Sequence, residues 1–317
     1  MKFYHKLFIF AACLFSNLGF ANADSQIIGG QWRGLNTGDS SLQIADNEAQ
    51  DLLNVDVTAS GYGIKKRDGT TQFRTLSSST WGVRGGYYFK DAAGNNNIIH
   101  ANAKAIYYSR NGAAYVSFIT TQTDGAYYDF TDSNGTLWFA NSGRDVIASW
   151  TGTALTSYAS SPQGNQIEAL PDRLAITGTT ANPNRVHFSK RADFTSFAAG
   201  TEDASAFTED IGLPGASINC AKWADDRLLV WSRTSGSEIF TQSQFDLAPT
   251  IEFSNTIGCV QPNSVIRDFG VTYWQGQDGH FYGYDNGQVT WLSKSISETI
   301  AQLATGGQSK QWPQRER

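Results

Sequence analysis

The sequence predicts an all-β fold, a β-propeller of about five or six blades of short antiparallel strands, followed by a short C-terminal helix. Two observations carry this prediction: turn dipeptides separate aromatic-rich runs, and units made of several such runs start about 40 to 50 residues apart. Residues 273–291, YWQGQDGHFYGYDNGQVTW, show the first feature, because Asp278-Gly279 and Asn286-Gly287 divide them into three strand-like pieces. Both dipeptides favour the two positive φ angles of a type I′ turn.

The same turn signals recur along the chain and define repeating units. They are Asp68-Gly69, Asn111-Gly112, Asp124-Gly125 and Asn134-Gly135. The units they suggest are 83–118, 127–158, 167–197, 218–253 and 265–292. Each unit is too thin to hold a core alone and must stack on its neighbours, which accounts for aromatic residues along the whole chain. We therefore expect blades over residues 81–300, with a β-sandwich pair or a β-helix as the alternative architecture.

Helical periodicity is confined to two short segments. Residues 295–303, SISETIAQL, place Ile296, Ile300 and Leu303 on one helical face, and a second, weaker pattern covers 46–53. We expect 24–80 to form an N-terminal loop and a first hairpin, and 301–317 to form a polar C-terminal tail.

The charge balance argues against nucleic-acid binding by the surface at large. The 317 residues carry a net charge of −5. The one run of three basic residues, Lys65-Lys66-Arg67, is interpreted as a solvated hairpin edge in preference to a contact for an acidic partner or DNA. Proteins that bind phosphate backbones present a basic patch or stripe, which this sequence lacks.

The first 23 residues resemble a signal peptide. Lys2 and Lys6 precede an apolar run over 7–15, and Ala21 and Ala23 form a small-x-small cleavage site before Asp24. The run is too short to span a bilayer, so no membrane contact is expected after the leader is removed. A gene-start artefact is the other explanation for this segment.

The cysteines and histidines suggest no metal site. Without the leader, Cys220 and Cys259 remain, and they form either one disulfide or two buried free thiols. His100, His187 and His280 stand alone in strand-like contexts. The polar loop 91–97 lacks the acidic spacing of a calcium loop, so neither metal nor cofactor is expected.

No arrangement typical of catalysis is recognisable, and we expect no enzyme activity. The sequence contains no GxSxG elbow, phosphate loop or HExxH helix. Asp225 and Asp226 could form a glycosidase pair only if the fold brought them together at the required spacing. Asp132 to Trp138 looks superficially like an Asp-box turn, but its Asp is displaced, so an Asn-Gly hairpin is preferred.

Residues 28–69 carry a family resemblance. The matching elements, in order, are Gly34-Leu35-Asn36, the Ala45–Ala49 turn, Asn54-Val55-Asp56, and Gly63 with Lys66-Arg67-Asp68-Gly69. At the far end, 257–296 carries Gly258-Cys259-Val260, the Asp278-Gly279 hairpin and a Leu-Ser exit into a helix. Together these resemble β-propeller structural proteins of tailed bacteriophages, which lie in the neck or tail below the portal, and the resemblance covers about 28–300.

The resemblance implies a structural role in the virion. It implies a homo-oligomeric ring that contacts other neck or tail proteins, with DNA only as passing cargo. The leader is unexpected for such a protein and favours an alternative, an exported or periplasmic carbohydrate-binding propeller. In that case surface rings such as Trp150, Tyr158 and Trp274 would stack on a glycan, although strand alternation also allows them to be core residues.

Overall fold

The computed structural model describes residues 26–27, 34–36, 48–49, 55–57, 63–66, 82–124, 127–200, 204–211, 217–239, 250–297 and 300. The chain divides into two compact units, Met1–Thr71 with Ser295–Thr299, and Gln72–Lys294 with Ile300–Arg317.

The first unit contains two small sheets. Strands β1 (Gln26–Ile27), β5 (Gly63–Lys66) and β4 (Val55–Val57) form an antiparallel sheet with β5 in the centre. Strands β2 (Gly34–Leu35) and β3 (Glu48–Ala49) pair in parallel. The helix predicted over 46–53 and the turn at Ala45–Ala49 are therefore wrong at β3, where pairing with β2 holds the backbone extended.

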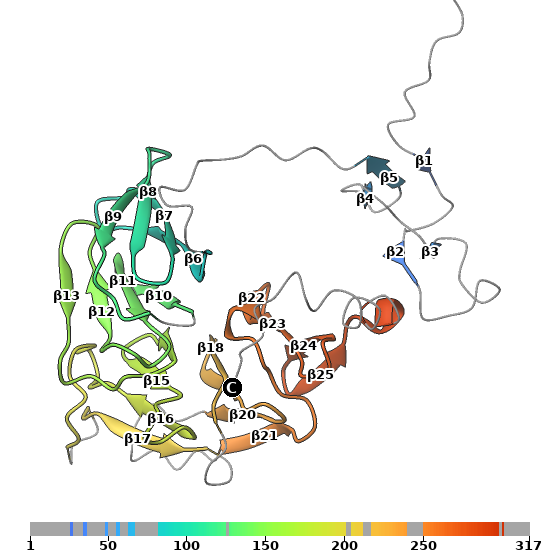
Figure 1. The fold of residues 1–317 in the computed structure, drawn as a ribbon. Helices are drawn as coiled ribbons and strands as arrows, with labels where there is room; N and C mark the ends of the chain where they lie inside the picture. Colours follow the sequence, from blue (N-terminus) through green and yellow to red (C-terminus); the bar gives the residue numbers. More distant parts are fainter. Residues whose placement is uncertain are drawn as a thin grey trace, which may run out of the picture. The chain divides into compact units, whose positions relative to one another are not determined.

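The second unit consists of five four-stranded antiparallel sheets, and each sheet follows the order of the chain (Figure 1). We number these sheets blades 1 to 5. Their strands are, in blade 1, β6 (Gly85–Lys90), β7 (Asn96–Ala101), β8 (Ile106–Arg110) and β9 (Val116–Ile119); in blade 2, β10 (Asp129–Ser133), β11 (Thr136–Ala140), β12 (Ala148–Trp150) and β13 (Leu155–Ser157); in blade 3, β14 (Gln166–Ala169), β15 (Leu174–Thr177), β16 (Arg185–Phe188) and β17 (Phe207–Asp210); in blade 4, β18 (Cys220–Ala224), β19 (Arg227–Trp231), β20 (Gly236–Ile239) and β21 (Thr250–Ser254); and in blade 5, β22 (Ile266–Asp268), β23 (Val271–Gln275), β24 (Phe281–Asp285) and β25 (Gln288–Trp291). The prediction of an all-β propeller is confirmed, and each predicted unit contains most of one blade.

Hydrophobic cores lie between successive blades. Strand alternation allows one strand to serve two cores, since neighbouring residues point to opposite faces of a sheet. In β11, Phe139 packs in the cluster shared with blade 1, whereas Trp138 packs in the cluster shared with blade 3. In β19, Leu228 packs in the cluster shared with blade 3, and Leu229 packs in the cluster shared with blade 5. The middle blades are thus covered on both faces.

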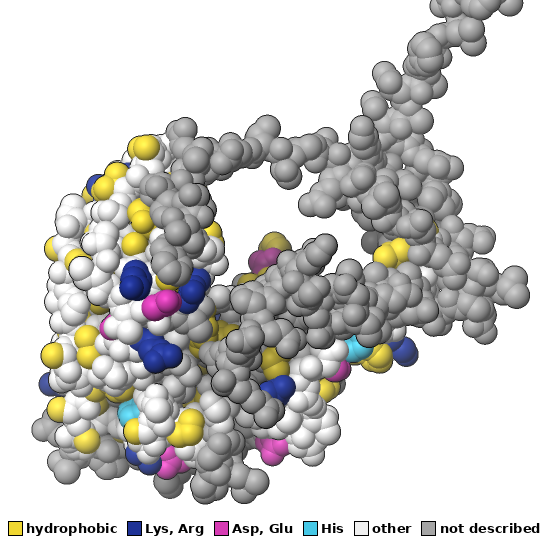
Figure 2. All heavy atoms as spheres, in the orientation of Figure 1, with side chains coloured by type: hydrophobic (Ala, Val, Ile, Leu, Met, Phe, Trp, Pro, Cys, Tyr) yellow, Lys and Arg dark blue, Asp and Glu magenta, His cyan; other side chains and the backbone are white. Residues whose placement is uncertain are grey.

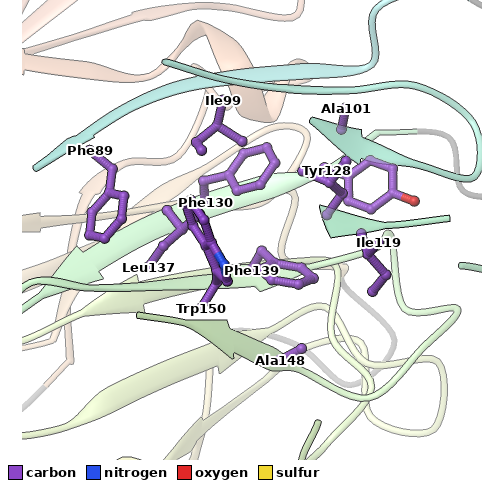
Figure 3. Close-up of a cluster of buried hydrophobic side chains, with 11 residues drawn as sticks. Phe89, Ile99, Ala101, Ile119, Tyr128, Phe130, Leu137, Phe139, Ala148 and Trp150 are labelled. Atoms are coloured by element: carbon purple, nitrogen blue, oxygen red, sulfur yellow. The ribbon is translucent and has the colours of Figure 1, made fainter. Parts of the chain in front are cut away.

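The core between blades 1 and 2 is rich in aromatic rings (Figure 3). Phe89 of β6 and Phe130 of β10 reach into it from neighbouring blades. Trp150 is 2% exposed and lies 5.9 Å from Phe89, measured between ring centroids. Burial of rings of this size supplies most of the stabilisation that holds two thin sheets together.

The hairpin turns follow the predicted chemistry in part. Asn134-Gly135 joins β10 to β11 and Asn286-Gly287 joins β24 to β25, and all four residues have the positive φ of a type I′ turn. Asp278-Gly279 is different, because only Gly279 has a positive φ and the loop between β23 and β24 spans five residues. The type I′ prediction is wrong there.

Two short 3₁₀ helices accompany blade 5. Helix η1 (Pro262–Ser264) precedes β22, and η2 (Lys294–Ile296) follows β25 at the start of the predicted helix over 295–303. Most of the remainder of that helix lies outside the described residues. Within the part of the chain that the structure describes, no helix is long and apolar enough to cross a membrane.

Candidate functional site

The candidate site is the row of polar contacts along the innermost strands of the propeller. The first strands of successive blades, β6, β10, β14, β18 and β22, lie side by side (Figure 1). Each pairs with its own blade along one edge only, which leaves backbone N–H groups along the other edge in need of acceptors.

Side chains from the preceding blade satisfy several of these edge groups. Asp129 Oδ2 accepts the Ile167 N–H at 2.8 Å, and Thr131 Oγ1 accepts the Ala169 N–H at 3.1 Å. These two bonds join β10 to β14. From the first bond to the second, the acceptor moves two residues forward in β10 and the donor moves two residues forward in β14. The two innermost strands therefore run in the same direction.

Glu168 repeats the arrangement one blade further on. Its Oε1 accepts the Trp223 N–H at 3.1 Å and lies 2.9 Å from Lys222 Nζ. Burial would by itself lower the pKa of the Lys222 ammonium, but the charge and hydrogen bond of Glu168 outweigh it and raise that pKa. The buried Glu168 carboxylate is therefore paired with a cation that remains charged.

Asp129 is the most perturbed carboxyl group of the row. Burial raises the pKa of Asp129 to about 7, and the negative charge of Glu168 adds to this rise. The hydrogen bond from Ile167 acts in the opposite direction and lowers the pKa. Next to it, the Tyr87 hydroxyl donates to Asp132 Oδ1 at 2.7 Å. Burial and this hydrogen bond raise the pKa of Tyr87, so the phenol stays protonated.

These contacts limit what the row can do chemically. Asp129 and Glu168 accept backbone N–H groups that hold neighbouring blades together, and Glu168 also binds Lys222. A general acid or base must instead be free to reach a substrate. The row therefore acts as a structural seam between blades 2, 3 and 4, and we refer to it as the axial seam.

Asp225 and Asp226 sit in the β18–β19 turn, and both are engaged in ion pairs. Asp225 binds Arg267 of β22, and Asp226 lies 2.7 Å from Arg227 Nε. The hydrogen bond from Arg227 lowers the pKa of Asp226. A glycosidase acid needs a raised pKa, so this carboxylate is unsuited to that role.

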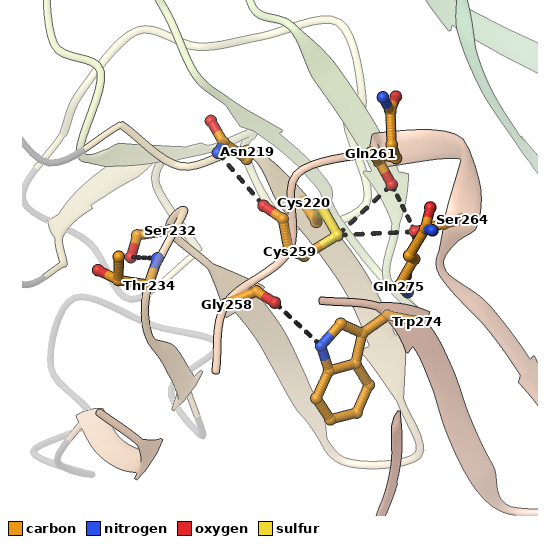
Figure 4. The surroundings of a disulfide bond; sticks show 10 residues. All are labelled: Asn219, Cys220, Ser232, Thr234, Gly258, Cys259, Gln261, Ser264, Trp274 and Gln275. Carbon is orange, nitrogen blue, oxygen red and sulfur yellow. Dashed lines mark hydrogen bonds between the residues drawn. A yellow bond between two sulfur atoms is a disulfide. The ribbon is translucent and has the colours of Figure 1, made fainter. Parts of the chain in front are cut away.

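A disulfide joins blade 4 to the connection that leads into blade 5 (Figure 4). Cys220 of β18 is bonded to Cys259, with the two Cα atoms 6.1 Å apart. Gly258, the residue before Cys259, is tightly enclosed, because a Cβ atom there would lie 2.3 Å from the carbonyl carbon of Arg233. Its carbonyl oxygen accepts the Trp274 Nε1–H at 3.1 Å.

The other family-signature residues have local roles where they are described. Asp278 Oδ1 accepts the His280 N–H at 3.1 Å and its Oδ2 accepts the Tyr282 hydroxyl at 2.6 Å, while Gly279 has a φ of 83°. Gly34 lies in β2, Asp56 lies in β4, and the buried Asn36 donates its backbone N–H to Ala49. The remaining signature and cleavage residues, Ala21, Ala23, Asp24, Asn54, Arg67 and Gly69, lie outside the described residues.

Of the three aromatic residues proposed to face a glycan, the two tryptophans are buried and Tyr158 is partly exposed. Trp150 is buried, Trp274 is 0% exposed, and Tyr158 stacks on Trp138 at 5.4 Å and bonds to Ser149. The interpretation of Trp150 and Trp274 as surface rings is wrong because blade stacking uses both in cores. On the face in Figure 2, hydrophobic side chains of the described residues lie scattered among polar ones.

The loop 91–97 is a polar turn whose carboxylate, Asp91, is occupied by neighbouring protein groups. Asp91 accepts the Asn95 N–H at 2.8 Å, and Arg110 Nη2 lies 3.6 Å from its carboxylate. Burial acts to raise the pKa of Asp91, but hydrogen bonds from Asn95 and Asn97 lower it overall. Within the described ranges, no group of three or more His, Cys, Asp and Glu could hold a metal ion.

Sequence reasoning did not find the axial seam. Asp129, Thr131 and Glu168 belong to no motif, and their partners lie 38 to 55 residues further along the chain. The only available signal was a polar residue at alternate positions of the first strand in a unit.

The fold and its axial seam define a β-propeller protein. No protein-family model matches the chain, and no curated protein matches its sequence. Among solved structures, a catalytically inactive virginiamycin B lyase from Staphylococcus aureus with quinupristin is 14% identical, over 86% of this chain and 85% of that chain, with a TM-score of 0.51. An extracellular domain of BT4673 from B. thetaiotaomicron is 12% identical over 69% of this chain and 28% of that chain, with a TM-score of 0.49. At this level of identity, the likeness shows the fold alone.

Proposed function

We propose that this protein is a non-enzymatic structural component of a phage virion neck or tail, a propeller that assembles into a ring below the portal. The observation that carries the proposal is the order of motifs in two separated segments, 28–69 and 257–296, which resembles that of the phage propeller family. Two members of the second segment, Gly258 and Asp278, have close-packing and turn-capping roles that restrict their replacement.

The axial seam is consistent with a mechanical role. Its carboxylates bind backbone groups and a lysine of the next blade, which stiffens the disc between blades 2, 3 and 4. A component that transmits load through a ring needs this rigidity. A glycan hydrolase would need two free carboxyl groups at a defined spacing.

A second candidate function is an exported or periplasmic carbohydrate-binding propeller. The Cys220–Cys259 disulfide favours it, because disulfides form and persist mainly in oxidising compartments. The signal-peptide-like leader over 1–23 points the same way. Any ring that stacks on sugar would have to be among the exposed ones, such as Tyr88 or Trp291.

The test is negative-stain electron microscopy of the chain from Asp24 to Arg317, with the oligomer mass measured by light scattering. Rings with a central channel are the expected result. A monomer that binds a defined glycan on an array would instead support the exported propeller. Hydrolysis of a glycan that is abolished by changing one carboxylate would overturn both proposals.

A further inference from the structure

The exposed hydrophobic side chains are concentrated at the two ends of the blade series. Among the described residues, the exposed large hydrophobic side chains in or next to blades 1 and 5 are Val83, Tyr88, Val116, Ile266, Phe269, Phe281, Trp291 and Leu292. Among the described residues of the three middle blades, the exposed large hydrophobic side chains are Leu155 and Ile251. Of the side chains at the two ends, Tyr88 lies on the face of blade 1 turned away from blade 2, and Ile266 and Phe281 lie on the face of blade 5 turned away from blade 4, so both end faces are partly exposed.

Blade 5 has an apolar outward face. Trp274 and Tyr282 pack towards blade 4, so residues of opposite parity on the same strands point away from it. Ile266 and Tyr273 are cross-strand neighbours on that outward side, and Ile266 is 58% exposed. Phe281 lies on the same side and is 46% exposed.

Blade 1 presents a similar outward face. Tyr87 and Phe89 pack towards blade 2, which turns Tyr88 away from it. Tyr88 is 60% exposed and pairs across the strands with Ile98. On the same face Ile98 is half-buried, whereas His100 and Ser109 are buried, so the exposed apolar part of this face is centred on Tyr88 and Ile98.

The charges at the margins of the two faces are complementary. Lys90 ends β6 on the outward side of blade 1, and Asp268 ends β22 on the outward side of blade 5. Asp285 lies on the same face as Phe281 and adds a second carboxylate to the outward side of blade 5. The innermost strands β10 and β14 run in the same direction. The same stacking of β22 beside a β6 strand would therefore bring the ends of the two strands, with Asp268 and Lys90, to the same end of the interface.

We propose that the outward face of blade 5 in one copy of this chain packs against the outward face of blade 1 in a second copy. The interface is heterologous and joins copies head to tail, which generates a ring when the rotation closes. It extends the same blade-on-blade stacking that forms the internal cores. This inference rests on the proposed ring-forming function and names the surfaces that would form the ring.

The test uses cysteine cross-linking in the chain that starts at Asp24. One preparation carries Lys90→Cys, a second carries Asp268→Cys, and the two are mixed and treated with a short bismaleimide. The native Cys220 and Cys259 are bonded to each other and do not compete. The matched control replaces Asp268→Cys with Thr153→Cys, an exposed position on blade 2.

The expected result is a covalent species of twice the monomer mass from the Lys90→Cys and Asp268→Cys mixture, which is absent from the control mixture. Adding Ile266→Lys to the Asp268→Cys chain should abolish the product without changing the melting temperature, since Ile266 is exposed. No cross-linked dimer would overturn the proposal. A bridge within a single chain carrying both substitutions would also overturn it, because the two faces would then cover each other in one molecule. Rings in the electron microscope without this cross-link would leave the ring-forming function intact and overturn only this interface.

Discussion

Glu168 in blade 3 accepts the backbone N–H of Trp223 in blade 4 at 3.1 Å while its carboxylate also binds Lys222. One side chain therefore satisfies an edge amide and a cation of the next blade. Replacing Glu168→Ala leaves both without this partner, and we expect a loss of about 2–3 kcal/mol in the free energy of unfolding. Glu168→Gln keeps an acceptor for the amide and should lose less.

The measurement for Glu168 is urea denaturation of the two variants and the wild type. The control is Asp210→Ala, which breaks the exposed Arg185–Asp210 pair and should cost less than about 1 kcal/mol. Equal losses for Glu168→Ala and Asp210→Ala would show that the seam contributes no more than a surface ion pair.

Asp129 should make stability depend on pH. Its pKa is raised from the ordinary 3.8 to about 7 in the folded protein. Between pH 3.8 and about pH 7, the folded state therefore binds more protons than the unfolded state. The stabilisation is fully present below about pH 4 and is lost as pH rises towards 7, by at most about 4 kcal/mol.

Asp129→Asn removes this titration while keeping an acceptor for the Ile167 N–H. The difference in unfolding free energy between wild type and Asp129→Asn should change between about pH 4 and pH 7 and be constant above that range. Asp210→Asn is the control. The hydrogen bond from Arg185 lowers the pKa of Asp210, so the contribution of Asp210 to stability is lost as pH falls, which is opposite in direction to the effect of Asp129. A pH-independent difference for Asp129→Asn would contradict the prediction.

The disulfide should contribute strongly to stability. It links residues 39 apart in the sequence, and the chain-entropy description gives about 4 kcal/mol for a closed loop of this size. The double replacement Cys220→Ala with Cys259→Ala should lower the melting temperature. A reductant should lower the melting temperature of the wild type and leave that of the double variant unchanged; a wild type insensitive to reductant would argue that the thiols are not bonded.

Phe269 occupies an unfavourable backbone conformation in an exposed turn. Phe269 has a φ of 47°, forms the β22–β23 turn with Gly270, and is 98% exposed. Asparagine tolerates positive φ better than phenylalanine does, so Phe269→Asn should stabilise the protein by about 1 kcal/mol. The reciprocal change Asn134→Phe, in a turn with the same pattern of φ angles, should destabilise it by a similar amount; thermal unfolding of both variants is the measurement.

The sequence predicted the blades because hairpin signals are local. Asn134-Gly135 and Asn286-Gly287 form the turns that their chemistry favours, and the strands on either side follow from them. The sequence carries no signal for the Phe269-Gly270 turn, since phenylalanine is not a residue that favours positive φ. The strand at Glu48–Ala49 was misread as helical because its pairing with Gly34–Leu35 is not local.

The site was harder to predict than the fold. The bond between Glu168 and Trp223 exists only because stacking brings β14 beside β18. Composition does not reveal which face of a strand is covered, so Trp150 and Trp274 could not be assigned to cores in advance. Their burial follows from which blades are neighbours.

The division of Phe139 and Trp138 between two cores has a consequence for sequence change. Inserting or deleting one residue within β11 would exchange the two rings between the cores that they fill, and would therefore disrupt the contacts of blade 2 with both neighbours at once. Homologues of this protein should therefore differ in length only within the turns. The second strand of each middle blade should keep the same number of residues.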